Sequence, residues 1–294
     1  MKLKEKIFSY IKSMRPETWF IGGVPLIFMS IIASNFDLSF STIIGMISLF
    51  FISIIFVLGA TNMFNEVFDV DADRINKPCR SIVSKKISRE SAFYLSLVLF
   101  ALALIWSYCL NITLFYLTVI AVSIGIAYSL PRLRFKDHAI SSMFTLGTGY
   151  GFLIPMSPWA LFASDEVLIG LLITVISFIW FFGTTNFKDF KDVIGDKIKG
   201  SKTLPLTVGV KKTIRLMMLL MSIIPSIILG IYIYKNIFPI WCSLAFISFI
   251  ATFILLFKIM KNYSPDFAFK GYKLTYLIYP SIFVFLTIGF WLGG

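Results

Sequence analysis

The chain has 294 residues, of which 58% are hydrophobic and 14% are charged, and its mean hydropathy is +0.87. Soluble globular domains carry about 25% charged residues, so this composition excludes an ordinary soluble enzyme and indicates an integral membrane protein. The net charge of +12 is explained by membrane topology and anionic lipid headgroups, and we expect no nucleic-acid partner.

Nine apolar segments are long enough to cross a bilayer. We place them at 18–35, 43–65, 91–109, 112–130, 139–157, 166–186, 214–234, 237–257 and 274–292. The sequence therefore predicts an all-α membrane protein, with nine transmembrane helices in a single domain that spans residues 1–294.

Positive charge lies almost entirely on one side of these predicted spans. Of the 27 Lys and Arg residues, all except Lys235 fall in the N-terminal arm or in the loops that follow the even-numbered spans. By the positive-inside rule, the N-terminus and these loops are cytoplasmic and the C-terminus is outside.

Two acidic clusters follow the second and sixth predicted spans. The first reads "NEVFDVDAD" (65–73) and the second "KDFKDVIGD" (188–196). In a continuing helix, each cluster presents one polar face: Asn65, Asp69 and Asp73 in the first, and Asp189, Asp192 and Asp196 in the second. Carboxylates at the edge of a membrane are costly unless they meet cations, so both faces are candidate binding sites.

The two clusters match each other at a constant offset. A shift of 123 residues aligns Asp69 with Asp192, Asp73 with Asp196 and Glu66 with Asp189. This match predicts a duplicated four-helix unit, with halves 1–136 and 137–273 and an added ninth helix at 274–292. The active-site mouth would then lie on the cytoplasmic side, between the two acidic faces.

Carboxylates and an amide carbonyl, without thiolates, are hard oxygen ligands that favour Mg²⁺. Two facing acidic surfaces repel each other unless something bridges them, and two Mg²⁺ ions with a diphosphate have the matching charge. The basic residues that flank the clusters are candidates to bind the outer phosphate oxygens: Lys77, Arg80, Arg134, Lys188 and Lys202. An EF-hand calcium loop is excluded, because Arg74 replaces its required Gly.

The paired motifs resemble those of the UbiA-type intramembrane prenyltransferase family. That family carries Asn-Asp-x-x-Asp-x-x-x-Asp after its second helix and Asp-x-x-x-Asp after its sixth, in a nine-helix fold. "YSLPRLRFK" (128–136) resembles its fourth-to-fifth loop and "MRPETW" (14–19) its first-helix entry, so the resemblance spans the chain. The sequence departs from the family pattern at Glu66, which replaces the second-position Asp, and at Ser81, where a Pro is usual.

The resemblance implies transfer of a prenyl group from a prenyl diphosphate, with Asp69, Asp73, Asp192, Asp196 and Tyr128 as catalytic residues. It implies that Asn65 and these four aspartates hold Mg²⁺, and we keep Glu66 and Asp189 as further candidate ligands. It also implies that Arg80, Lys188 and Arg134 hold the diphosphate, and that the Tyr128 ring steadies the allylic cation.

Several alternatives stay open at this point. A terpene cyclase of the same family would act on a prenyl diphosphate without an acceptor, and a secondary transporter would also use repeats and acidic residues. For a transferase, the lipophilic acceptor could be an aromatic quinone precursor such as a homogentisate-like ring, a chlorin or a glyceryl lipid. "NFKDFKDVIGD" and "INKP" look closest to the chlorophyll-synthase and archaeal lipid branches.

Overall fold

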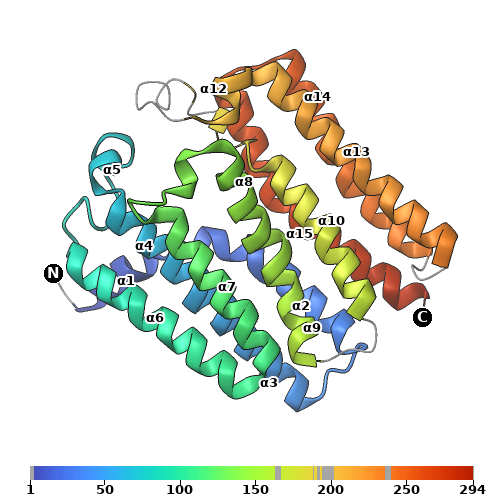
Figure 1. The fold of residues 1–294 in the computed structure, drawn as a ribbon, viewed down its shortest axis with the longest axis horizontal. Helices are drawn as coiled ribbons and strands as arrows, with labels where there is room; N and C mark the ends of the chain where they lie inside the picture. The colour runs from blue at the N-terminus through green and yellow to red at the C-terminus, as the bar shows by residue number, and fades with distance from the viewer. Residues whose placement is uncertain are drawn as a thin grey trace.

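The computed structural model describes residues 3–162, 167–187, 189, 190, 193, 202–235 and 240–293. These residues form a bundle of helices without a strand (Figure 1), and the all-α prediction is confirmed. A single isolated bridge pairs the backbone of His138 with that of Lys202.

The helices follow one another with short connections. In chain order they are α1 Leu3–Ser13, the 3₁₀ turn η1 Pro16–Thr18, α2 Trp19–Ala33, α3 Phe40–Leu49, the π-helical η2 Phe50–Gly59, α4 Ala60–Phe68, α5 Val70–Asn76, α6 Arg89–Leu110, α7 Ile112–Ser129, the 3₁₀ turn η3 Phe135–Asp137, α8 Ala139–Leu146, the π-helical η4 Gly147–Leu153, α9 Ile154–Phe162, α10 Val167–Thr184, α12 Leu204–Val208, α13 Val210–Lys235, the 3₁₀ turn η5 Ile240–Ala245, α14 Phe246–Lys261 and α15 Pro265–Gly293.

Eight helices in the described part of the chain are long and apolar enough to cross a membrane. They are Pro16–Ala33, Phe40–Phe68, Arg89–Leu110, Ile112–Ser129, Val167–Thr184, Val210–Gly230, Ile240–Lys261 and Pro265–Gly293. These eight correspond to all of the predicted spans except the fifth. Seven of them begin and end within four residues of the sequence-based bounds, because long apolar runs fix a helix locally.

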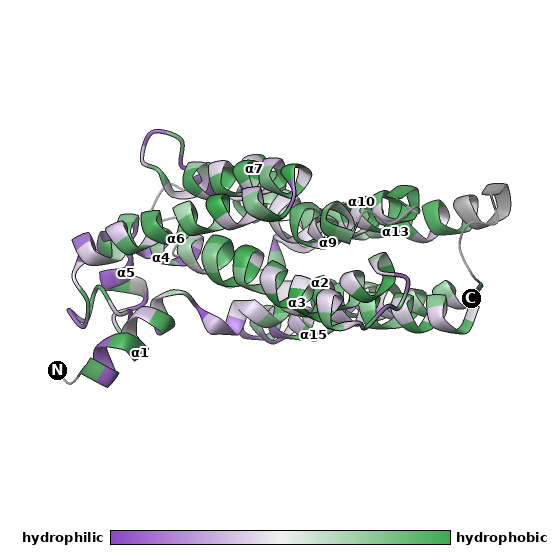
Figure 2. Ribbon diagram, turned by 90° about the horizontal axis from the view of Figure 1, so that it is seen from below, coloured by the Kyte–Doolittle hydropathy of each residue, from purple (hydrophilic) through white to green (hydrophobic). Residues whose placement is uncertain are grey.

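The fifth predicted span, 139–157, is helical as α8, η4 and α9 but is not one of the eight candidates. Its Gly147, Gly149 and Gly151 lower its hydropathy, and one of them serves packing: a Cβ on Gly151 would lie 2.7 Å from the Cα of Phe178. This stretch and α10 are therefore in close backbone contact. Helix α1 and the end of α15 lie at opposite ends of the bundle (Figure 2), as an odd number of crossings requires. The ninth crossing stays a prediction.

Three apolar clusters lie within the described part of the bundle, and two of them are large. One gathers Trp180, Tyr279 and Phe283 from α10 and α15, and the other gathers Phe64 and Phe100 from α4 and α6. Large apolar side chains also cover the outside of the bundle, as lipid-facing helices require. Hydrophilic segments gather at the end of the bundle where α1 and α5 lie (Figure 2).

The helix that carries the first acidic cluster is distorted at Asp69. There the backbone (φ −103°, ψ 8°) separates α4 from α5. The hydrogen-bond ladder nevertheless continues, from Asp69 N to Asn65 O (3.1 Å) and from Asp73 N to Asp69 O (2.8 Å). The three residues thus lie on successive turns of an almost continuous helix.

Candidate functional site

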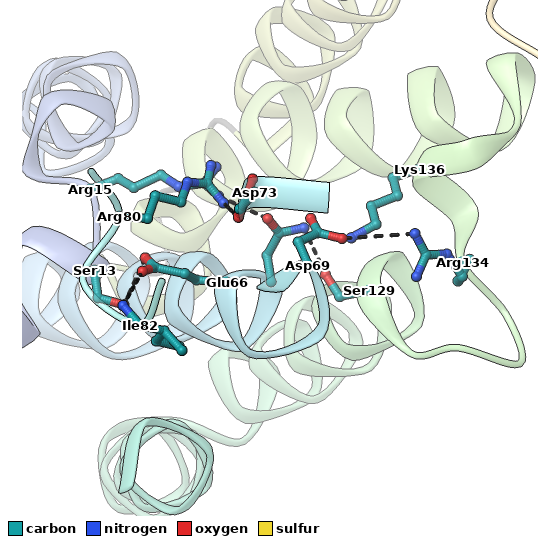
Figure 3. A network of polar contacts seen from close by, with 11 residues as sticks. Ser13, Arg15, Glu66, Asp69, Asp73, Arg80, Ile82, Ser129, Arg134 and Lys136 are labelled. Carbon is teal, nitrogen blue, oxygen red and sulfur yellow. Dashed lines mark hydrogen bonds and ion pairs between the residues drawn. The ribbon is translucent and has the colours of Figure 1, made fainter. Parts of the chain in front are cut away.

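The first acidic cluster lies at the polar end of the bundle and is largely removed from solvent. Asn65 is 7% exposed and Asp73 is 4% exposed, and the side chain of Asp69 is 16% exposed. Figure 3 shows Asp69 and Asp73 at the centre of a polar network, with Arg15 and Arg80 on one side and Lys136 and Arg134 on the other.

Asp69 and Asp73 are each paired with a cation from a different loop. Asp73 forms an ion pair with Arg80, from the loop that precedes α6. Asp69 Oδ1 accepts a hydrogen bond from Lys136 Nζ (2.5 Å). Arg134 Nη2 lies 3.8 Å from the same oxygen. Arg134 donates instead to Asp137, with 2.6 Å between Nε and Oδ2.

The two cations that pair with the cluster are themselves poorly solvated. Burial lowers the pKa of Arg80, the nearby charge of Arg15 lowers it further, and Asp73 opposes both effects. Burial likewise lowers the pKa of Lys136, and the charge of Asp69 opposes this lowering. Partly desolvated cations interact more strongly with an anion than exposed ones do, because the local dielectric constant is lower.

Arg15 extends the site toward the first helix. Its Nη2 donates to Asn65 Oδ1 (2.8 Å), and Asn65 Nδ2 donates to Ser129 Oγ (3.1 Å). The Arg15 Nε atom is buried and makes no hydrogen bond within the described residues. Arg15 and Arg80 therefore place two guanidinium groups of like charge near each other, which favours an anionic ligand between them.

Glu66, a predicted metal ligand, makes contacts with two segments of the chain in the structure. It is 2% exposed and accepts hydrogen bonds from Ser13 Oγ (3.1 Å) and from the backbone N–H of Ile82 (2.9 Å). Its carboxylate points toward Ser13 and Ile82 (Figure 3). In this arrangement Glu66 fastens α1 and the loop before α6 to α4, and so positions Arg80.

The other predicted site residues are placed as follows. Lys77 and Tyr128 line the main cavity, and Asp189 is buried. The Lys202 side chain is exposed, and its backbone N–H bonds to Asp137 O (3.3 Å). Lys188, Asp192 and Asp196 lie outside the described residues, so the second acidic cluster is described only at Asp189.

A cavity of about 680 Å³ opens beside the polar network. Lys12, Arg15 and Arg80 line its polar end. Its lining follows α7 from Tyr128 down to Leu114, a length of about 21 Å at the helical rise per residue. Apolar and aromatic side chains form most of its wall: Ile21, Val57, Leu58, Leu114, Leu117, Ala121, Ile154, Trp180 and Phe181.

The donor atoms of the first cluster fit a divalent cation. Asn65 Oδ1 and the carboxylates of Asp69 and Asp73 are hard oxygen ligands on successive turns, which suit Mg²⁺. Within the described residues, no three His, Cys, Asp or Glu side chains form a metal site by themselves. Mg²⁺ usually binds through a few carboxylates together with phosphate oxygens, so a diphosphate would have to complete its coordination here.

Sequence reasoning missed three residues of the site. Lys136 stands in "YSLPRLRFK", from which Arg134 alone is taken as a site residue, and Arg15 stands in "MRPETW", which by itself could place it at an acidic acceptor or at lipid headgroups. Tyr150 also lines the cavity, and an isolated Tyr in an apolar helix gives no signal. The presence of cations near the motifs was visible in the sequence, whereas the choice among them depends on loop conformation.

We predict that Glu66→Ala lowers the free energy of unfolding by about 1–3 kcal/mol, because two buried donors, Ser13 Oγ and Ile82 N, lose their acceptor. Thermal unfolding of the purified protein in detergent measures the effect. Asp71→Ala is the matched control, since the Asp71 side chain is 93% exposed and its ion pair with Arg74 is at the surface. Equal melting temperatures for the two variants would contradict the fastening role.

A sequence profile described as the UbiA prenyltransferase family matches residues 23–290. A digeranylgeranylglyceryl phosphate synthase of Methanosphaera stadtmanae is 28% identical over 234 residues, which cover 79% of this chain and 80% of that protein. A solved structure of a digeranylgeranylglyceryl phosphate synthase is 26% identical, with a TM-score of 0.78, and covers 97% of this chain and 99% of that one.

A UbiA homolog from Archaeoglobus fulgidus, solved with GPP and Mg²⁺ bound, has the same fold. It is 18% identical, with a TM-score of 0.71, and covers 95% of this chain and 99% of that one. The resemblance inferred from the paired motifs is confirmed by these matches: the chain belongs to the UbiA prenyltransferase family.

Proposed function

We propose that this protein transfers a geranylgeranyl group from geranylgeranyl diphosphate to a free hydroxyl of a glyceryl phosphate lipid. The observation that carries the proposal is a cluster of paired carboxylates and cations at the polar end of a long apolar cavity. The names of the relatives support the acceptor class. Digeranylgeranylglyceryl phosphate carries two prenyl chains on glycerol, so its last chain is added to a glyceryl phosphate that bears one.

Donor binding in this proposal exchanges the partners of the existing ion pairs. Arg80 and Lys136 now neutralise Asp73 and Asp69, and they would turn to the phosphate oxygens of the donor. Asn65, Asp69 and Asp73 would then hold one Mg²⁺ ion, and the second cluster, with Asp192 and Asp196, would hold another. Bound Mg²⁺ neutralises the negative charge that develops on a leaving diphosphate.

The cavity wall protects the reactive carbon from water. Breaking the allylic C–O bond gives a cation that water would convert into an alcohol, so the reaction needs an enclosed apolar space. Val57, Leu117 and Ala121 form part of such a wall. The ring of Tyr128 lines the same space and, in the proposal, stabilises the cation through its π face.

The acceptor also has to be recognised at the polar end. Its phosphate is a dianion, and Lys12 and Arg15 line the cavity close to the donor site. The positive-inside pattern of the sequence supports a cytoplasmic location for this end. We therefore propose that donor and acceptor phosphates both enter from the cytoplasmic side, with their chains in the bilayer.

We expect purified protein in nanodiscs to join geranylgeranyl diphosphate to geranylgeranylglyceryl phosphate when Mg²⁺ is present, with the product identified by its mass. Asp69→Asn should lower turnover at least about a hundredfold, the scale for losing electrostatic stabilisation of a transition state. Asp71→Asn is the matched control and should keep near-normal turnover, because Asp71 is exposed and makes its ion pair with Arg74. Diphosphate release without acceptor, with a hydrocarbon or cyclic alcohol as product, would replace the proposal with a cyclase.

We also expect the length of the α7 wall to set the length of the donor chain. Ala121→Phe adds a ring to the cavity lining, so turnover with geranylgeranyl diphosphate should fall at least about tenfold relative to geranyl diphosphate. Ser123→Phe is the control, because Ser123 is exposed on the same helix and does not line the cavity. An unchanged ratio of the two turnover rates in Ala121→Phe would show that the donor chain lies elsewhere.

A further inference from the structure

Among the described residues that line the cavity, two carry a carboxylate: Glu17 and Glu66. Glu66 is buried and already accepts hydrogen bonds from Ser13 and Ile82. Glu17 is exposed, and within the described part of the chain its side chain makes no hydrogen bond or ion pair. Glu17 is therefore the carboxylate of the cavity whose oxygens are available to a ligand.

The turn that carries Glu17 is held firmly in place. Thr18 Oγ1 donates to Arg15 O (2.8 Å) and accepts from Asn62 Nδ2 (3.0 Å). Asn62 Nδ2 also donates to Met14 O (3.2 Å), so one buried side chain of α4 binds both ends of this segment. Arg15 enters the turn with a left-handed backbone (φ 55°). The position of Glu17 relative to α4 is thus fixed by contacts on either side of it.

The surroundings of Glu17 combine an apolar wall with a few polar groups. Tyr276 from α15 lines the cavity, its hydroxyl lies 3.1 Å from that of Tyr272, and Glu17 is near enough to affect it electrostatically. Arg15 lies two residues before Glu17 and lines the same cavity. A carboxylate and a guanidinium on one short turn can bind a hydroxyl and a phosphate, respectively, of the same small headgroup.

Ether formation requires that the acceptor hydroxyl lose a proton. When its oxygen attacks an allylic cation, it becomes a positively charged oxonium until the proton leaves. The basic side chains at the polar end are cations, and a charged cation cannot accept this proton: Lys12, Arg15, Lys77 and Arg80. Asp69 and Asp73 are engaged with cations and lie at the donor site.

We propose that Glu17 is the general base that accepts the proton of the glyceryl hydroxyl, while Arg15 binds the phosphate of the same acceptor. This inference rests on the proposed transfer to a glyceryl phosphate. The allylic C–O bond breaks with its electron pair going to the diphosphate, and a new C–O ether bond forms from a lone pair of the acceptor oxygen. The O–H proton goes to the Glu17 carboxylate and then to solvent, which the exposed side chain reaches.

Glu17→Gln tests the proposal, because it keeps the size of the side chain and removes its basicity. With wild-type product formation established first, the variant should form the ether about 10²–10⁴ times more slowly, the range for losing a general base. The Michaelis constant for the acceptor should change by less than about threefold, and the proportion of prenyl alcohol in the products should rise. Donor binding should stay at the wild-type level, and Glu17→Asp should recover part of the rate.

Glu90→Gln is the matched control, since Glu90 is exposed at the start of α6 and does not line the cavity. Wild-type ether formation by Glu17→Gln would overturn the proposal and assign the proton to another acceptor, such as the leaving diphosphate. A raised Michaelis constant with an unchanged turnover number would also overturn it, because Glu17 would then only hold the acceptor. Absence of ether from the wild-type protein would instead refute the proposed function itself.

Discussion

Two carboxylates at the end of an apolar helix must be neutralised, and much of the site follows from this electrostatic requirement. Asp73 pairs with Arg80 from the loop before α6, and Asp69 pairs with Lys136 from η3. These ion pairs hold two loops, distant in sequence, against the end of α4. Glu66 also binds the loop before α6, because its carboxylate accepts a hydrogen bond from the backbone N–H of Ile82. The same cations that stabilise the fold thereby stand where a diphosphate would need them.

The cavity makes this charge arrangement chemically useful. Its wall along α7 is apolar over most of a membrane-spanning helix, whereas its polar end combines guanidinium, ammonium and amide groups. A prenyl diphosphate has the same division between chain and headgroup. In our account the diphosphate site generates an allylic cation and the cavity wall excludes water. The turn that carries Arg15 and Glu17 binds the acceptor and accepts its proton. Each of these functions is assigned to a different element, so each can be altered separately by mutation.

The parts of this site that could be predicted from sequence are those set by local patterns. Apolar runs located the eight candidate spans, and the four-residue spacing placed Asn65, Asp69 and Asp73 on successive turns. The partner of Asp69 could not be predicted from sequence. Whether Lys136 or Arg134 reaches its carboxylate depends on the conformation of the segment that contains η3. Glu66 occupies a motif position, yet its donors come from residues 13 and 82, which only tertiary structure brings together. The fifth predicted segment is helical as expected, but the close approach of Gly151 to Phe178 of α10 could not be predicted from its sequence.

The most direct test of the central claim is the Mg²⁺ dependence of donor binding. Equilibrium binding of a non-hydrolysable geranylgeranyl diphosphate analogue to the protein in nanodiscs would be measured with and without Mg²⁺. The account predicts tight binding that requires Mg²⁺ and is lost in Asp69→Asn, because Asp69 and Asp73 release their cations only when a metal replaces them. Equally tight binding without Mg²⁺, unaffected by Asp69→Asn, would contradict the exchange of ion pairs on which the account is built.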